Sequence, residues 1–143
     1  MEPVSGDEYI IRRIPPPRPS MDFITQKTDG LWRATSAALH RREGEMGLSC
    51  SRLAVTSPKQ LLAQINASVH DGWEVCIWKV SDIPEGLSVV ITPSSPPELD
   101  PGHCEIRSQN FTDRLRSKLA KASVVLTHAQ VETMRAGDSA DVV

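Results

Sequence analysis

A short apolar run that ends in a block of prolines limits how this chain can fold more than any other segment does. Tyr9, Ile10 and Ile11 favour extended backbone, so the segment 8–14 is predicted to form a strand. The block Pro15–Pro19 contains four prolines, and proline fixes φ and has no N–H to donate to a neighbouring strand. The strand must therefore stop at residue 14, and the chain must leave the sheet there.

Two arginines lie inside this predicted strand. Side chains alternate along a strand, so Arg12 and Arg13 point to opposite faces, and one of them faces the buried side of the sheet or a cleft. A buried arginine is costly unless it is paired. The segment also satisfies the pattern R-x-x-P-x-x-P, which can bind an aromatic groove as polyproline II, but we favour its interpretation as a rigid strand exit.

The other apolar segments are short and predict more strands than helices. The sequence Ser-Pro-Lys-Gln at 57–60 has the form of a capping box and predicts a helix that ends at the Asp-Gly pair 71–72. Segment 73–80 is apolar on both faces, which predicts a central strand. Helices are also predicted after Thr112 and after Thr127. Further strands are predicted at 31–39, 48–55, 87–92, 103–108 and 123–127.

These segments predict one α+β domain. Because strands outnumber helices, we expect a mixed or mainly antiparallel sheet of about six short strands with two to three helices. The domain is predicted to span residues 8–136, between flexible tails at 1–7 and 137–143. A length of 143 residues is ordinary for one domain.

Composition narrows the classes of function. The formal net charge is −2, so no overall basic field attracts nucleic acid, and nucleic acid is not an expected partner. No apolar run approaches the ~20 residues of a membrane span, and the acidic, polar start does not read as a signal peptide. The three cysteines are an odd number without a C-x-x-C pair, which favours a reducing cytoplasm.

Arginines and hydroxyls on separate predicted strands indicate a ligand site. Seven of the eleven arginines lie in the first 52 residues, and arginine favours bidentate contact with carboxylate or phosphate. Side chains of this kind, spread over several strands, suit a small anionic or nucleotide-like ligand, although a structural hydrogen-bond network remains the alternative. The predicted ligand-binding residues are Arg12, Arg13, Arg33, Thr35, Ser36 and Ser49.

His103 and Glu105 are the candidate catalytic residues. His103 follows the stiff turn Asp100-Pro101-Gly102, a good position for a general base or a substrate contact, and Glu105 is an acid inside an apolar strand. Histidines and cysteines elsewhere lack tight ligand spacing, so no metal site is predicted. There is also no G-x-S-x-G elbow and no phosphate-binding glycine loop.

Two resemblances involve these residues. The chain resembles a loose group of uncharacterised bacterial proteins through the motifs RRIPP, WRATSAA, GLSC and DPGHCEI, which lie at 12–16, 32–38, 47–50 and 100–106. The order of elements is also similar to small ADP-ribosyltransferase-like folds, including the RES-type toxins that degrade NAD. That resemblance implies NAD as ligand. It implies that Arg12 or Arg13 grips the pyrophosphate, that Thr35 and Ser36 order the ribose, and that Glu105 steadies the oxocarbenium ion.

Two functions from different classes remain open at this stage. One is a cytoplasmic bacterial domain that binds an anionic or nucleotide-like ligand, with NAD chemistry in a toxin or defence system as its specific form. The other is a non-catalytic accessory module that binds a protein partner. The first predicts that the candidate residues converge on one pocket, and the second predicts an exposed apolar patch around Trp32 or Trp73.

Overall fold

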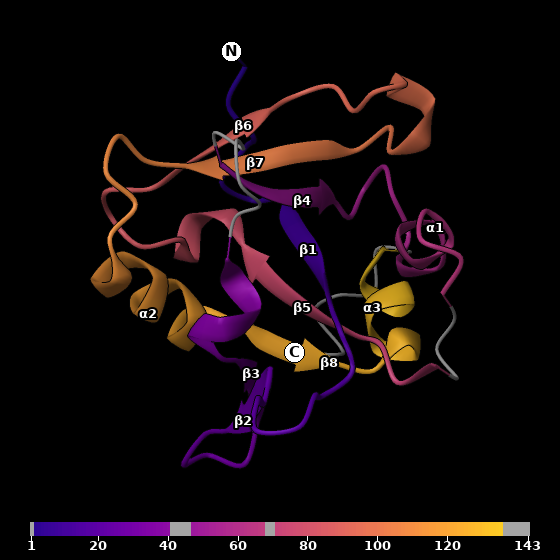
Figure 1. Cartoon of the computed structure of the whole chain (residues 1–143). Coiled ribbons are helices and arrows are strands. Elements are labelled where there is room, and N and C mark those ends of the chain that lie inside the picture. Colours follow the sequence, from indigo (N-terminus) through magenta and orange to yellow (C-terminus); the bar gives the residue numbers. More distant parts are fainter. Residues whose placement is uncertain (1, 41–46, 68–70, 136–143) are drawn as a thin grey trace.

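The strands pair in the order β2-β3-β8-β5-β1-β4-β7-β6, and each pairing is antiparallel (Figure 1). The computed structural model describes residues 2–40, 47–67 and 71–135. Within them the eight strands are β1 (Tyr9–Ile14), β2 (Ile24–Gln26), β3 (Trp32–Ala34), β4 (Leu48–Arg52), β5 (Glu74–Lys79), β6 (Ser88–Ile91), β7 (His103–Arg107) and β8 (Val124–Leu126). The predicted α+β class and antiparallel sheet are confirmed, while the predicted number of about six strands is low.

Two strands differ from the sequence prediction, and each difference has a physical reason. β2 has only three residues, none of them buried, so it carries no apolar alternation that a sequence could reveal. The strand predicted at 31–39 ends at Ala34, and the 3₁₀ helix η1 (Ser36–Leu39) follows, because Ala38 and Leu39 turn inward to be buried. β5 is the fourth strand of the sheet and is buried on both faces, as predicted for the central strand.

Three α-helices lie within the described residues: α1 (Pro58–Ala63), α2 (Asp113–Ala122) and α3 (His128–Thr133). The capping box that begins α1 is confirmed, because Gln60 N donates to Ser57 Oγ at 3.1 Å and Ser57 N donates to Gln60 Oε1 at 2.8 Å. The helix is shorter than predicted. Asn66 has φ 54°, a left-handed conformation that ends the helical path, and residues 68–70 lie outside the described residues.

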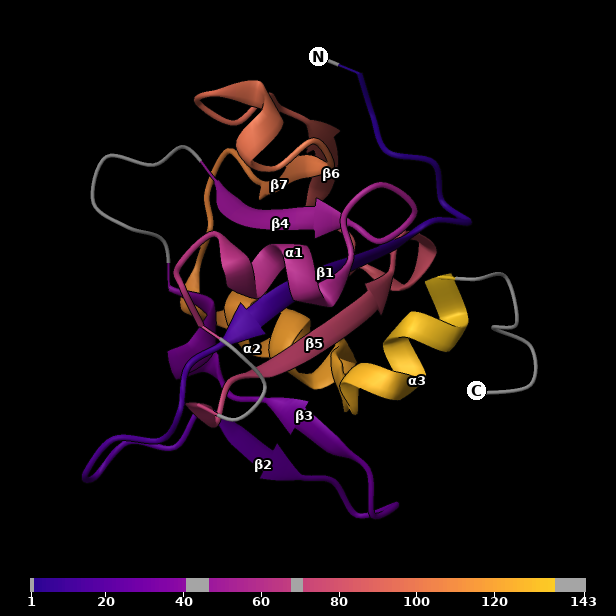
Figure 2. The same ribbon diagram turned by 90° about the vertical axis from the view of Figure 1, so that its right-hand side faces the viewer.

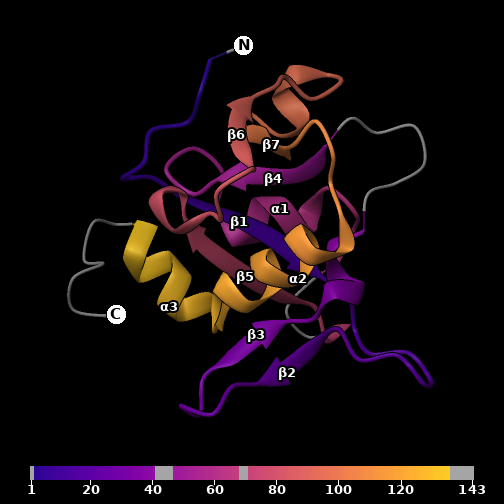
Figure 3. The same ribbon diagram turned by 90° about the vertical axis from the view of Figure 1, so that its left-hand side faces the viewer.

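Helices cover the two faces of the sheet unequally (Figures 2 and 3). α2 and η1 lie over one face, where Trp78 is buried and its Nε1 donates to the Leu119 carbonyl at 2.9 Å. On the other face α1 and α3 pack against β1, β5 and β8 through Leu61, Val131 and their neighbours. No residue of β4 or β7 joins that second apolar cluster, so these two strands present polar side chains on this face.

The N-terminal segment differs from the flexible tail predicted for 1–7. Val4 N donates to Val89 O at 3.0 Å, and Ile91 N donates to Glu2 O at 2.8 Å, so residues 2–4 extend the sheet along β6. Val4 is also buried, at 6% exposure. An edge strand offers unpaired backbone groups, and this segment satisfies them. The tail predicted at 137–143 lies outside the described residues.

Candidate functional site

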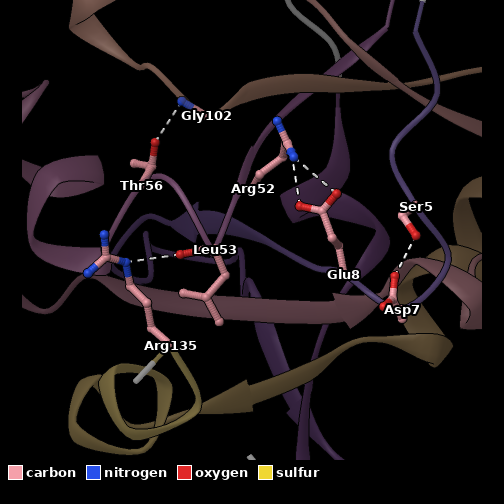
Figure 4. Close-up of polar contacts among 8 residues, drawn as sticks. All are labelled: Ser5, Asp7, Glu8, Arg52, Leu53, Thr56, Gly102 and Arg135. Carbon is pink, nitrogen blue, oxygen red and sulfur yellow. Dashed lines mark hydrogen bonds and ion pairs between the residues drawn. The ribbon is translucent and has the colours of Figure 1, made fainter. Parts of the chain in front are cut away.

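A cleft opens where β1 and β4 separate. β1 pairs with β5 over six residue pairs, but it pairs with β4 only at Ile10 and Ile11. A two-bonded ion pair fixes the closed end, since Arg52 Nε and Nη2 donate to the two carboxylate oxygens of Glu8 at 2.9 and 3.1 Å (Figure 4). Beyond Ile11 the strands diverge and leave a cavity of about 630 Å³, which extends over β4 and β7 on the face that carries α1.

The floor of the cleft consists of polar residues that the strand register brings together. Ser49 lies opposite Glu105, and Ser51 lies opposite His103, in the antiparallel pair of β4 and β7. Directly opposed residues share a face, and all four line the cleft. The alternate residues of both strands, such as Cys50 and Ile106, are buried in the apolar cluster under α2. The sequence thus places one polar and one apolar face on each of these strands.

Arg12 bridges the two separated strands. Its Nη1 donates to the Ser49 carbonyl at 2.6 Å, and its Nε and Nη2 lie 3.4 Å from the carbonyls of Ala38 and His40. These acceptors satisfy the donors of the guanidinium without neutralising its charge. Among the described residues Arg12 forms no ion pair with a carboxylate. Within residues 2–40, 47–67 and 71–135, this half-buried cation at the edge of the cleft therefore has no carboxylate partner.

Two further arginines line the same cavity. Arg13 donates through Nη1 to the Leu61 carbonyl at 3.4 Å and to Gln64 Oε1 at 3.2 Å, which places it against α1. Arg18 is exposed, and its guanidinium carbon lies 5.9 Å from the centre of the Phe23 ring. Both predicted arginines of β1 thus reach the cleft, although they leave the strand on opposite faces, because the cleft lies at the open edge of β1.

The two carboxylates of the cleft are already bound. Glu105 is 8% exposed, and its Oε1 accepts a hydrogen bond from Arg107 Nε at 2.9 Å. Asp100 is 4% exposed and accepts from Ser51 Oγ at 2.6 Å and from Thr56 Oγ1 at 2.7 Å. Arg12, Arg13 and Arg18 thus bring three positive charges to the walls, against the carboxylates of Asp100 and the Arg107-paired Glu105.

The Asp100 network also fixes the wall above β4. Thr56 Oγ1 accepts a hydrogen bond from the Gly102 amide at 2.9 Å (Figure 4). A Cβ at Gly102 would lie 2.6 Å from Thr56 Oγ1 and 2.9 Å from the Arg52 carbonyl, so glycine is required for this close approach. The buried carboxylate therefore ties the loop at 94–100 to β4 and to the turn before α1.

His103 is oriented by the backbone. Its Nδ1 lies 2.9 Å from both the carbonyl oxygen and the hydroxyl of Thr92. A carbonyl only accepts, so Nδ1 carries a proton and donates to the Thr92 carbonyl. Ser51 donates to Asp100 and is fully buried, so it does not form a Ser-His-Asp arrangement with this histidine.

The cysteines are not reactive groups in this structure. Burial raises the pKa of the Cys50 thiol to about 12, and burial also raises the pKa of the Cys76 and Cys104 thiols. A thiol in this state is neither a nucleophile nor a metal ligand at neutral pH. Among residues 2–40, 47–67 and 71–135, no group of three or more His, Cys, Asp or Glu side chains is arranged to hold a metal ion.

Three predicted ligand-binding residues lie outside the cleft. Arg33, Thr35 and Ser36 do not line it, because β8 and β5 separate β3 from β1 in the sheet. Arg33 donates to the Ala34 carbonyl at 2.9 Å, and Thr35 Oγ1 donates to the Asp22 carbonyl at 2.9 Å. These three residues therefore do not join Arg12 in the cleft, and their role as ligand-binding residues stays a prediction.

Sequence reasoning missed several residues of the cleft, among them Gln64, Trp73, Asp100 and Arg18. Gln64 lies at the C-cap of α1, which is shorter than its apolar pattern predicts. Trp73 opens the segment predicted as the central strand and directly precedes β5, so its bulk indicates a core residue. Asp100 and Arg18 lie in proline-rich segments. The usable signal was the position of Arg18 within the proline block that ends β1.

Comparisons of this chain with protein-family models, curated protein sequences and solved structures found no match. The two resemblances drawn from sequence motifs therefore stay predictions. Within the described residues, no helix has both the length and the apolar character needed to cross a bilayer. The chemistry of the cleft is therefore the basis for a proposal about the function of this protein.

Proposed function

We propose that this protein binds a small anionic ligand in the cleft between β1, β4 and β7. The observation that carries the proposal is Arg12, a half-buried cation whose hydrogen-bond partners among the described residues are all carbonyl oxygens. Carbonyls orient a guanidinium but leave its charge free to attract an anion. A partly desolvated cation stabilises a bound anion more than an exposed one does, because the local dielectric is lower.

Arg18 extends this positive site towards solvent. Its side chain is exposed and lies beside Phe23 rather than beside an acid. A planar guanidinium presents paired donors that match the oxygens of phosphate or carboxylate. Arg12 at the back and Arg18 at the mouth therefore suit an anion with several oxygens, and the free thiols favour a reducing compartment such as the cytoplasm.

Binding is proposed here in preference to NAD cleavage. The cleavage mechanism needs hydroxyls beside the arginine, but Thr35 and Ser36 lie on another part of the sheet. It also needs a glutamate beside those hydroxyls, and Glu105 lines the cleft apart from them with its Oε1 bound by Arg107. NAD remains among the ligands to be titrated, and its consumption, followed by mass spectrometry, would support the more specific role in a toxin or defence system.

Replacing Arg18 with glutamine is expected to weaken pyrophosphate binding about tenfold, because a hydrogen bond to a charged group contributes about 1.5–3 kcal/mol. Isothermal titration calorimetry at low salt measures the change. The matched control is Arg114→Gln, which removes the same charge from an exposed position on α2, outside the cleft. Equal affinities for the two variants, or no binding by the wild type, would contradict an anion site in the cleft.

A protein-binding role is the second candidate function. Leu31 and Trp32 are 48% and 44% exposed, and they lie near the β2 edge of the sheet, far from the cleft in strand order. Neighbouring exposed apolar side chains of this size are typical of interaction surfaces. This role is compatible with ligand binding, since the two surfaces share no residue.

The Trp32→Ser variant is expected to lose a partner that co-purifies with the wild-type protein, because aromatic residues dominate interface energies. With the partner then purified, the dissociation constant should rise at least about fivefold, which corresponds to about 1 kcal/mol. The variant Trp73→Ser serves as the comparison. A partner that is retained equally by both variants would exclude Trp32 from the interface.

A further inference from the structure

We propose that the anion bound in this cleft is the phosphate of a nucleotide, whose base stacks against Trp73. This inference rests on the proposed function and goes further by naming the class of ligand. Three features of the cleft support it: an apolar wall that includes an indole ring, an amide donor without an acceptor among the described residues, and fixed polar atoms on the floor. A simple anion would not use the indole ring.

The apolar wall is formed where β1 ends and β5 begins. Ile14 and Glu74 are the last paired residues, and Pro15 and Trp73 are the residues next to that pair. Both line the cleft, together with Leu61 of α1, and Trp73 is half-buried. An indole ring beside aliphatic side chains is a stacking surface for a flat heterocycle, and such stacking does not depend on the identity of the base.

Gln64 supplies a hydrogen-bond donor at the same end of the cleft. Its Oε1 accepts from Arg13, which fixes the orientation of the amide. Its Nε2 is buried and has no hydrogen-bond partner among the described residues. A buried donor without an acceptor is unfavourable. Nε2 has less than 1 Å² of accessible surface, so a base that stacks on Trp73 would supply the missing acceptor only after the Gln64 side chain turns towards the cleft.

The floor offers two polar atoms to a ligand. His103 directs Nδ1 to Thr92, which leaves Nε2 as the ring nitrogen that faces a ligand. Glu105 uses Oε1 for the Arg107 pair, which leaves Oε2 as an acceptor. A ribose hydroxyl both donates and accepts, so it can pair with either of these atoms. A cavity of about 630 Å³ lies within the usual range for a small-molecule site.

The first test compares ligands on the wild-type protein and needs no variant. AMP carries phosphate, ribose and base, ribose 5-phosphate lacks the base, and pyrophosphate lacks both base and sugar. Calorimetry is expected to give AMP an affinity at least about tenfold higher than that of ribose 5-phosphate. If ribose 5-phosphate and pyrophosphate bind as tightly as AMP, the nucleotide inference fails while anion binding stands. If none of the three binds, both proposals fail.

The second test uses Trp73→Leu, which keeps an apolar side chain and removes the ring. This variant is expected to bind AMP about tenfold more weakly and to bind pyrophosphate as the wild type does. The control Trp32→Leu, at the far end of the sheet, should change neither affinity. AMP should also quench tryptophan fluorescence in wild type and Trp32→Leu but not in Trp73→Leu. Unchanged AMP binding by Trp73→Leu would overturn the inference.

Discussion

Replacing Asp100 with alanine is expected to lower the free energy of unfolding by about 2–6 kcal/mol. Two buried hydroxyls, those of Ser51 and Thr56, would each lose a short hydrogen bond to the carboxylate. A buried donor left without an acceptor costs about 1–3 kcal/mol, and the two costs add because each hydroxyl donates to a different oxygen. The Asp100→Asn variant keeps one acceptor oxygen and should lose about half as much.

Urea denaturation followed by circular dichroism measures this loss of stability. The control is Glu98→Ala, which removes an exposed acid from the same loop and should change the free energy of unfolding by less than about 0.5 kcal/mol. Equal stability of Asp100→Ala and wild type would show that the buried network does not fix the loop. The same variant should also bind the anionic ligand more weakly, since the loop at 94–100 lines the cleft.

Local structure was largely predictable because its signals are local. The proline block ends β1 at Ile14, the capping box begins α1, and the two apolar faces of segment 74–79 mark a central strand. Each of these depends on residues within a few positions of one another. β2 was missed for the same reason, since its three residues are stabilised by pairing with β3 rather than by a pattern of their own.

Site residues were predicted correctly only where the strands that carry them are neighbours in the sheet. Arg12, Ser49, His103 and Glu105 all line the cleft, because β1, β4 and β7 are adjacent in the sheet. Arg33 belongs to β3, whose sequence resembles that of the site-forming strands, but β3 lies three positions away from β1 in the sheet. Strand order is decided by the packing of α2, α1 and the connections over the two faces. No residue pattern within β3 carries that information.

The cleft exists because β1 and β4 separate. Two paired positions hold the strands together, and the Glu8–Arg52 ion pair strengthens that end. Beyond it, the Ser49 carbonyl has no β1 amide to accept from, and the guanidinium of Arg12 takes that place at 2.6 Å. An arginine therefore replaces a ladder hydrogen bond, and it brings a positive charge to the gap that it bridges.

Replacing Arg12 with methionine is accordingly expected to weaken pyrophosphate binding about 10–100-fold, because it removes a charge-assisted contact with the anion of about 1.5–3 kcal/mol. Stability should fall by about 1–3 kcal/mol, since the Ser49 carbonyl loses its donor. The control Arg33→Met removes an arginine whose single carbonyl acceptor lies outside the cleft, and it should leave pyrophosphate affinity unchanged.

The Arg12→Lys variant separates the two roles of this residue. Lysine keeps the charge but has one compact ammonium group, which cannot reach the carbonyls of Ala38, His40 and Ser49 together. Stability should therefore fall as in Arg12→Met, while pyrophosphate affinity should fall less, by about fivefold. If both variants lose affinity equally, the guanidinium acts by holding β1 to β4, and the anion is bound by the neighbouring arginines instead.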